Sequence, residues 1–142
     1  MSELVTKGDF ARLQRGDALE AFELFVTHAD VQDYLEATGE RNPLWDTYIP
    51  PLALGAFALG GLMDRIQVPE ALIHTGQEYA FREAVPIGSA IDVRIHVASI
   101  SERRGAVMAV FATELRVGDT VAGTGRTTVM IGPPELVAPD AL

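Results

Sequence analysis

The first regular hydrophobic pattern along the chain indicates a strand. Phe22, Leu24 and Val26 recur at every second position, which is the period of a strand with one buried face. We therefore predict a strand at residues 20–26, preceded by a weakly patterned lead-in at residues 1–17.

A short amphipathic helix is predicted directly after this strand. Thr27 is a typical N-cap residue, and Asp30, three positions later, is an acidic partner for the first turn. Apolar residues then recur at helical spacing as far as Gly39, a residue that favours the C-terminal end of a helix. These signals predict a helix near residues 28–38.

A second helix of a different character is predicted at residues 51–64. Residues 47–63 carry no charge, and Pro51 suits the first turn of a helix. No face of this segment is polar before Asp64 and Arg65, so we expect the helix to be covered on all sides. The run is shorter than the ~20 apolar residues of a membrane span and contains prolines and glycines, which favours a helix buried inside a soluble domain.

The remainder of the chain predicts antiparallel strands. The alternation is clearest where Ile91, Val93, Ile95 and Val97 interleave with polar residues. The predicted strands are 73–81, 91–97, 107–117 and one that ends near 131, with turns at 84–88, 101–105 and 117–120, and an irregular tail with Pro133, Pro134 and Pro139. A sheet that encloses an apolar helix is an α+β arrangement.

Composition excludes some classes of function. The 142 residues suit a single domain, 1–142, and the net charge of -9 disfavours nucleic acid, which requires a basic surface. The absence of cysteine excludes disulfides and thiolate chemistry and makes the cytoplasm the default compartment. The N-terminus does not have the pattern of a secretory signal, and no motif for a nucleotide, a metal or a flavin is present.

The most informative string lies between the two predicted helices. Residues 37–46 read Ala-Thr-Gly-Glu-Arg-Asn-Pro-Leu-Trp-Asp. This string resembles the active-site loop of the MaoC-like hydratases and dehydratases, hot-dog-fold enzymes of enoyl thioesters, in which the loop reads Asp-x-Asn-Pro-x-His. Glu40 stands in the Asp position and Trp45 in the His position.

Two further strings support the resemblance, which extends over roughly residues 20–131. Residues 52–55, Leu-Ala-Leu-Gly, lie where the family has Ile-Ala-His-Gly at the start of its central helix. Residues 78–88 resemble the family's aromatic, Pro-Val and Gly-Asp signature, with Ser89 in place of the Asp. Pro50-Pro51 and residues 74–78 resemble more narrowly the N-terminal-type hot dogs, many of which are non-catalytic halves of a pair. The resemblance implies one hot-dog fold, in which an antiparallel sheet wraps a central buried helix.

The resemblance also implies which residues form the site. In the family a carboxylate and an imidazole share the proton transfer, and a glycine N–H polarises the thioester carbonyl. An indole donates a hydrogen bond but does not exchange a proton near neutral pH, so Trp45 cannot replace histidine in that role. The implied catalytic residues are Glu40, Asn42 and Gly55, and the implied substrate-binding residues are Trp45, Leu54 and His74, the last also a candidate compensating acid.

Each of these residues has a structural alternative. Asn-Pro is a common turn starter, and a Glu just past a helix end is most often solvated. Trp45 could plug the mouth of a pocket or pack an interface, and Gly55 could exist for close packing alone. His28 and His96 are expected at the surface, and Arg103-Arg104 at a solvated turn.

Three functions remain open at this stage. The first is a hydratase or dehydratase that uses Glu40 and the Gly55 N–H. The second is a hot-dog subunit with a degenerate site, which binds an acyl-CoA or acyl-carrier-protein thioester in a homodimer or heterodimer. The third is a thioesterase in which Glu40 alone activates water. The missing histidine favours the second and third, whereas the Asn-Pro loop favours the first two, and none of these reactions needs a cofactor or a metal.

Overall fold

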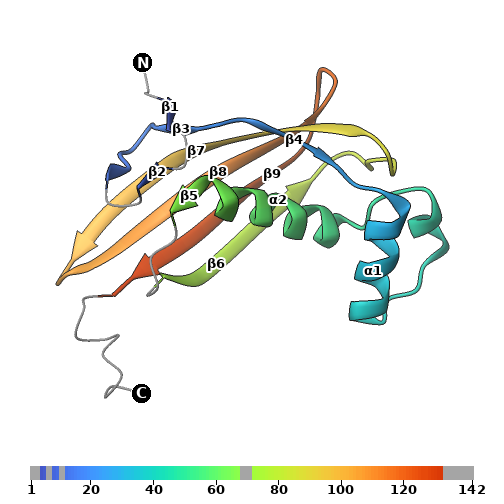
Figure 1. Ribbon diagram of the computed structural model, residues 1–142, viewed down its shortest axis with the longest axis horizontal. Helices are drawn as coiled ribbons and strands as arrows, with labels where there is room; N and C mark the ends of the chain where they lie inside the picture. The colour runs from blue at the N-terminus through green and yellow to red at the C-terminus, as the bar shows by residue number, and fades with distance from the viewer. Residues whose placement is uncertain (1–3, 6–7, 10–11, 68–71, 133–142) are drawn as a thin grey trace.

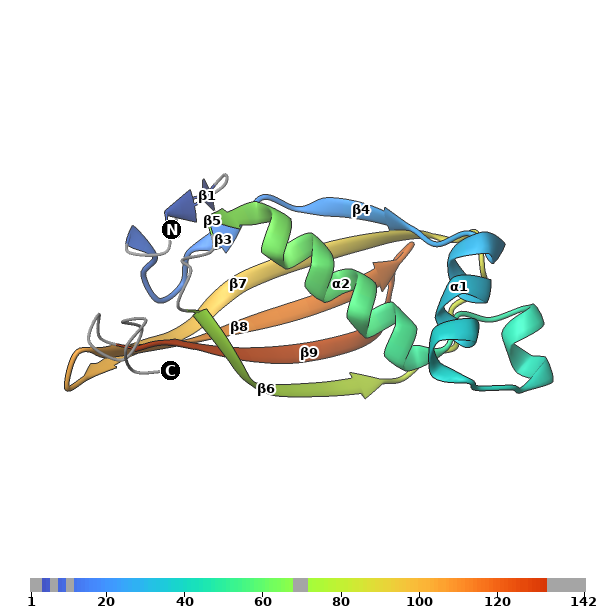
Figure 2. The same ribbon diagram turned by 60° about the horizontal axis from the view of Figure 1, so that its bottom comes forward.

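The structure is a computed structural model that describes residues 4–5, 8–9, 12–67 and 72–132. Its two main layers are a curved antiparallel sheet and helix α2 (Pro51–Arg65), which lies across the inner face of the sheet (Figures 1 and 2). The predicted α+β class is confirmed. The predicted irregular tail lies outside the described residues.

The main sheet has seven strands in the order β1-β3-β7-β8-β9-β6, and β4 also pairs with β7. Short strands β2 and β5 pair with each other in parallel. The strands are β1 (Leu4–Val5), β2 (Gly8–Asp9), β3 (Ala18–Leu19), β4 (Phe22–Phe25), β5 (Ile66–Gln67), β6 (Leu72–Phe81), β7 (Ala90–Arg103), β8 (Ala106–Val117) and β9 (Thr120–Ile131). The four long predicted strands are therefore confirmed. Part of the weakly patterned lead-in, for which we predicted no strand, forms β1 and β2.

Helix α1 (His28–Thr38) has the predicted bounds and the predicted caps. The side chain of Thr27 accepts a hydrogen bond from the Asp30 N–H at 3.1 Å, and Asp30 accepts one from the Thr27 N–H at 2.9 Å. Gly39 ends the helix in the left-handed conformation, with φ 72°, where glycine has no steric penalty. Local sequence therefore determines both ends of α1.

Helix α2 is buried on one side only, which corrects the expectation that it is covered on all sides. Leu54 and Leu62 are 2% and 1% exposed, against 68% for Leu52. Ala56 and Gly60, one and two turns beyond Leu52, are also exposed. The sheet curves around a single side of the helix (Figure 2), so the opposite stripe is left uncovered within one chain.

The turn between β7 and β8 is tighter than the predicted turn at 101–105. Strand β7 continues to Arg103, and only Arg104 and Gly105 connect it to β8. Both residues have positive φ, 53° and 83°, as a two-residue turn with the twist of a hairpin requires. The turn between β8 and β9, at Gly118 and Asp119, is where the sequence predicts it.

The long strands give the sheet two different faces, because side chains alternate along a strand. The inner face packs against α2 and includes the fully buried Val93, Val97, Phe111, Leu115 and Val129. The outer face includes Arg94, His96, Glu114, Thr124 and Arg126, which neighbour one another across β7, β8 and β9.

Candidate functional site

The Asn-Pro string forms a short 3-10 helix, η2 (Pro43–Asp46). The Asn42 side chain caps it by accepting a hydrogen bond from the Leu44 N–H at 3.0 Å. Pro43 occupies the first helical position, where a missing N–H costs nothing. In the structure Asn42 thus shapes the loop, and its predicted catalytic role stays a prediction.

Glu40 and Trp45, the two residues that the sequence resemblance places in the Asp and His positions, lie together. Trp45 Nε1 donates a hydrogen bond to Glu40 Oε1 at 2.9 Å. Glu40 is exposed, whereas Trp45 is half-buried. Because the indole N–H can only donate, this contact fixes the carboxylate and the ring but provides no route for a proton between them.

A mainly apolar cavity lies beside this pair, between η2, the N-terminal end of α2 and the end of β6. We call it the loop cavity; its volume is about 400 Å³. Among the residues that line it are Trp45, Tyr48, Leu54, Phe81 and Glu83. Trp45 and Leu54, the predicted substrate-binding residues, therefore share one cavity. Glu40 and Asn42 line a neighbouring groove on the α1 side of the loop instead.

Glu83 is a functional candidate that the sequence analysis missed. It contributes a carboxylate to the lining of the loop cavity, two residues beyond the end of β6. The signal lies in the string at residues 78–88, in which Glu83 falls between the aromatic and the glycine positions that carry the resemblance. The distance along the chain between Glu83 and the Asn-Pro loop hides their proximity.

Gly55 is packed tightly against a tyrosine. Its carbonyl accepts a hydrogen bond from the Tyr79 hydroxyl at 2.7 Å, and a Cβ at Gly55 would lie 2.5 Å from Tyr79 Cε2. Tyr79 also covers Gly125 and stacks on Phe81, with ring centroids 5.3 Å apart. Burial raises the pKa of the Tyr79 phenol.

The position of Gly55 in α2 also bears on its predicted role. It is the fifth residue of the helix, and the N–H of a fifth residue points to the carbonyl of the first. The N–H groups that precede the helical ladder are those of Leu52 and Ala53, since Pro50 and Pro51 have none. A role for Gly55 as the carbonyl-polarising donor stays a prediction, and close packing is the role that its contacts display.

His74 does not line the loop cavity. It lies near the start of β6, seven positions before Phe81, or roughly 20 Å along the strand. Its Nε2 lies 3.2 Å from Gln77 Oε1, and Thr127 donates to the same oxygen at 2.8 Å. His28 and His96 are exposed, as expected.

The described part of the chain has neither a metal-binding cluster nor a membrane-spanning helix. No group of three or more His, Cys, Asp or Glu residues there is placed to hold a metal ion. None of the helices formed by the described residues is long and apolar enough to cross a membrane.

Comparison with known proteins gives matches at the level of structure. No family model matches the chain, and no curated protein matches its sequence. The R-hydratase PhaJ1 of Pseudomonas aeruginosa superimposes with a TM-score of 0.72 at 18% identity, over 91% of this chain and 88% of that one. A MaoC-like dehydratase of Rhodospirillum rubrum gives 0.67 at 13% identity, over 87% and 96%. One chain of the truncated HadBC complex of Mycobacterium tuberculosis, a 3R-hydroxyacyl-ACP dehydratase, gives 0.64 at 18%, over 82% and 96%. The chain has the hot-dog fold.

The hot-dog fold explains why the candidate residues meet. The helix wrapped by a hot-dog sheet is α2 here (Figure 2). The loop that precedes it places Trp45 in the same cavity as Pro51 and Leu54, at the N-terminal end of the helix. The fold predicted from the three sequence strings is thereby confirmed. At identities below a quarter, the likeness establishes the fold and leaves the activity to be argued from the site.

Proposed function

We propose that this hot-dog chain is a subunit of the MaoC-like hydratase and dehydratase type, which binds an enoyl or 3-hydroxyacyl thioester of coenzyme A or an acyl carrier protein. The observation that carries the proposal is the loop cavity, where the family-like loop meets the N-terminal end of α2. Walls formed by Trp45, Leu54 and Phe81 suit an acyl chain, because apolar surface is removed from water on binding. The hydratase and dehydratase names of the structural neighbours agree with this class of ligand.

The inner end of the loop cavity favours a short acyl chain. Phe81 forms part of its wall, and the ring of Tyr79, which does not line the cavity, stacks on that of Phe81. The tight fit of Tyr79 over Gly55 and Gly125 leaves no space for it to move toward the helix or the sheet. A long chain would have to displace both rings.

We further propose that the isolated chain hydrates enoyl thioesters poorly. Hydration requires a base for water and an acid for the alpha carbon. Glu40 can be the base, but the residue that contacts it is an indole, which cannot deliver a proton. Glu40 and Trp45 therefore contact each other but cannot exchange a proton.

A second hot-dog subunit is part of this proposal. In the described residues β6 pairs only with β9, so its ten-residue outer edge is free to continue a sheet. The uncovered stripe of α2, which begins at Leu52, lies on the side that the chain's own sheet does not reach. A homodimer, or a heterodimer whose partner brings an intact Asp/His pair, would cover both. Light scattering of the purified protein at micromolar concentration tests this, and a monomer without a co-purifying partner contradicts it.

Binding can be measured through Trp45, which is the only tryptophan of the chain. Titration with butyryl-CoA should produce a saturable change in tryptophan emission, and free coenzyme A should produce a much smaller one. A Phe81→Ala variant, with a wider cavity, should shift the preference toward octanoyl-CoA. The absence of any acyl-dependent change would contradict the proposed function.

The catalytic prediction concerns the Glu40–Trp45 pair. With crotonyl-CoA the wild type should be ~100- to 10,000-fold slower than an enzyme with both proton-transfer groups. Trp45→His should raise the rate, and Glu40→Gln should abolish what remains. Enoyl absorbance follows the reaction. Turnover at the level of an ordinary hydratase would mean that another group supplies the acid, and the proposal of a degenerate site would be wrong.

A thioesterase is the second candidate, and Glu83 is the observation that favours it. A single carboxylate in the lining of the loop cavity could activate water against a thioester carbonyl. Release of free thiol from butyryl-CoA distinguishes this reaction from hydration. Glu83→Gln and Glu40→Gln, assayed side by side, identify which carboxylate is responsible.

A further inference from the structure

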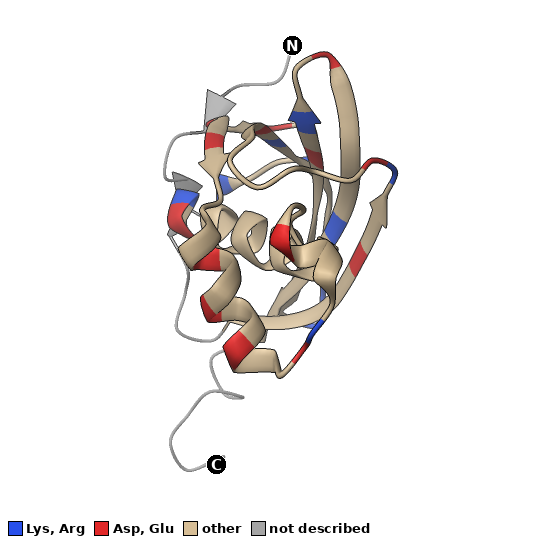
Figure 3. Ribbon diagram, turned by 90° about the vertical axis from the view of Figure 1, so that its right-hand side faces the viewer, with Lys and Arg blue, Asp and Glu red and all other residues tan. Residues whose placement is uncertain are grey.

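The end of the molecule that holds the loop cavity is acidic. Residues 28–46, which form α1 and the loop after it, contain five acids against one arginine, Arg41. The excess of acid is visible at α1 and the loop in Figure 3, which views the molecule from this end. The ion pairs that the described residues form lie in β7 and β8 instead. Four of the five acids are exposed: Asp33, Glu36, Glu40 and Asp46.

These acids border the loop cavity on the side of α1. Trp45 lines the cavity, and Glu36 and Glu40 line the groove on the other side of the same loop. On the opposite rim Arg82 and Glu83 follow the end of β6, and their charges are equal and opposite. A large molecule that delivers an acyl group into the loop cavity therefore comes to lie against negative charge.

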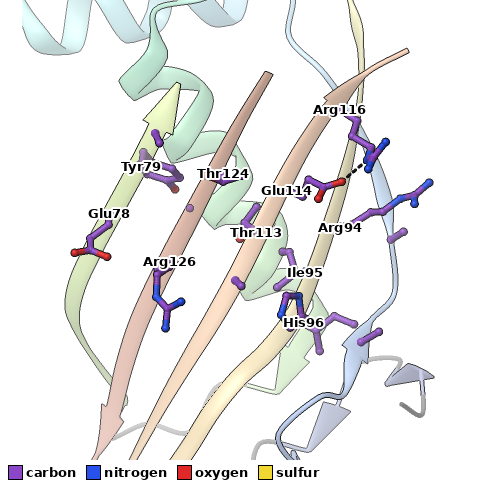
Figure 4. Close-up of a pocket in the computed structure, with 16 residues that line it drawn as sticks. Glu78, Tyr79, Arg94, Ile95, His96, Thr113, Glu114, Arg116, Thr124 and Arg126 are labelled. Atoms are coloured by element: carbon purple, nitrogen blue, oxygen red, sulfur yellow. Dashed lines mark hydrogen bonds and ion pairs between the residues drawn. The ribbon is translucent and has the colours of Figure 1, made fainter. Parts of the chain in front are cut away.

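Three arginines of the sheet are not placed to offset this charge. Arg94, Arg116 and Arg126 line a groove of about 850 Å³ on the outer face. Figure 4 shows their side chains on the side of the sheet away from α2. The loop cavity is lined in part by Leu54 of α2, on the inner side. A partner that docks at the cavity therefore meets the acids of α1 and the loop, and not the arginines of the outer face.

This distribution of charge distinguishes the two carriers that the proposed function leaves open. A specific contact between two proteins covers ~800 Å² of each partner, so an acyl carrier protein must rest on the surface around the cavity. An acidic carrier protein would place its own acids against those of α1, where like charges slow association and cost affinity. Coenzyme A is also anionic, but it is small, and its phosphates can bind the guanidinium groups of Arg41 and Arg82, which line the groove and the cavity.

From these observations we propose that the carrier of the thioester is coenzyme A, and that the acids of α1 exclude an acidic acyl carrier protein. This inference rests on the proposed function, because it concerns the ligand of the same cavity. It makes Asp33 and Glu36 residues that determine specificity without touching the acyl group. Both are exposed side chains of α1, so they act on a partner that is large enough to cover the helix.

Isothermal titration calorimetry with two ligands tests the proposal. The ligands are butyryl-CoA and the butyryl thioester of an acidic acyl carrier protein, and the readout is the ratio of their dissociation constants. In dilute salt the wild type should bind the carrier protein at least ~10-fold more weakly than butyryl-CoA. Raising the salt to about 0.5 M should narrow the ratio, because ions screen the repulsion between the two proteins.

Two double variants locate the effect. Asp33→Lys with Glu36→Lys reverses two charges on α1 and should lower the ratio at least ~5-fold, mainly through tighter binding of the carrier protein. The matched control is Glu20→Lys with Glu102→Lys, an equal change of charge at exposed residues outside α1 and the loop. Glu102 lies twelve positions along β7 from Ala90, which pairs with the end of β4 just before α1, or roughly 40 Å away. The control should leave the ratio unchanged.

The outcomes separate this inference from the proposed function. Circular dichroism should be unchanged in all variants, because the substituted side chains are exposed. A wild-type ratio near one, or a ratio that the α1 variant does not lower, overturns the inference. An equal fall in the control assigns the effect to net charge and overturns it as well. If butyryl-CoA binds and the carrier protein binds as tightly, the inference alone fails, whereas binding of neither ligand contradicts the proposed function and the inference with it.

Discussion

The two faces of the sheet use the same strands for opposite purposes. On the inner face, aromatic and branched side chains pack against α2, and glycines allow Tyr79 to approach the helix and the neighbouring strand. On the outer face, ion pairs and long side chains surround a hollow that no described helix covers. Close packing therefore governs which side chains fit on the inner face, and charge governs which fit on the outer face. The two faces should therefore respond to substitution on different scales.

The largest difference is expected for a matched pair on β8 and β7. Phe111 is fully buried on the inner face, and Phe111→Ala should lower the free energy of unfolding by ~3–5 kcal/mol through lost burial and a cavity. Arg94 forms an exposed ion pair on the outer face, so Arg94→Ala should cost less than ~1 kcal/mol. Urea denaturation measures both. Equal losses of unfolding free energy in the two variants would contradict this difference between the faces.

A smaller effect, with a change of sign, is expected along α2. Gly55→Ala should destabilise the protein by ~1–3 kcal/mol, because the added methyl group meets the Tyr79 ring, which has no space to retreat. A methyl group added at Gly60 would meet no atom of the same chain within 4 Å, so Gly60→Ala should stabilise the helix of the single chain by ~0.5–1 kcal/mol. Both variants are compared by urea denaturation at one protein concentration. A neutral Gly55→Ala would show that the inner contact is looser than its distances imply.

The smallest effect concerns the Tyr79 hydroxyl. Tyr79→Phe removes the hydrogen bond to the Gly55 carbonyl and should cost ~1 kcal/mol near neutral pH. Because burial raises the pKa of this phenol above the usual 10.0, its contribution is fully present below about pH 10. Above that pH the unfolded chain ionises first, so stability falls as pH rises. Unfolding midpoints of wild type and Tyr79→Phe between pH 8 and 11 should converge, and parallel curves would contradict the assignment.

The sequence predicted those parts of the fold that local signals control. The bounds of α1 follow from Thr27, Asp30 and Gly39, which act within a few residues of the helix ends. The exposed stripe of α2 could not be predicted, because an apolar sequence does not reveal which of its sides the sheet reaches. The turn predicted at residues 101–105 is longer than the two-residue turn that the structure contains. The sequence gives no strong signal for a polar residue with positive φ, such as Arg104.

The sequence predicted only the part of the candidate site that lies within one short string. The string at residues 37–46 identified Glu40 and Trp45, and their side chains do meet across five positions. Tyr79 lies in β6 and Glu83 just after it, more than thirty residues beyond that string, so only the folded sheet brings them to α2 and its loop. His74 belongs to the same strand, but it contacts a hydrogen-bond network near the start of that strand, far from the loop cavity. Sequence alone could not divide the residues of β6 between the two ends.

The order of the strands also has a consequence for how the chain closes on itself. Strands β7, β8 and β9 are joined by two-residue turns and need little loop closure, whereas Phe25 of β4 must find Ala90 and Phe81 of β6 must find Gly123. The entropic cost of bringing chain segments together rises with the length between them. The central meander is thus the local part of the topology, and the two flanking strands are its long-range part. Helix α2 is carried by the segment between those flanking strands, so its enclosure depends on the contacts that are most distant in sequence.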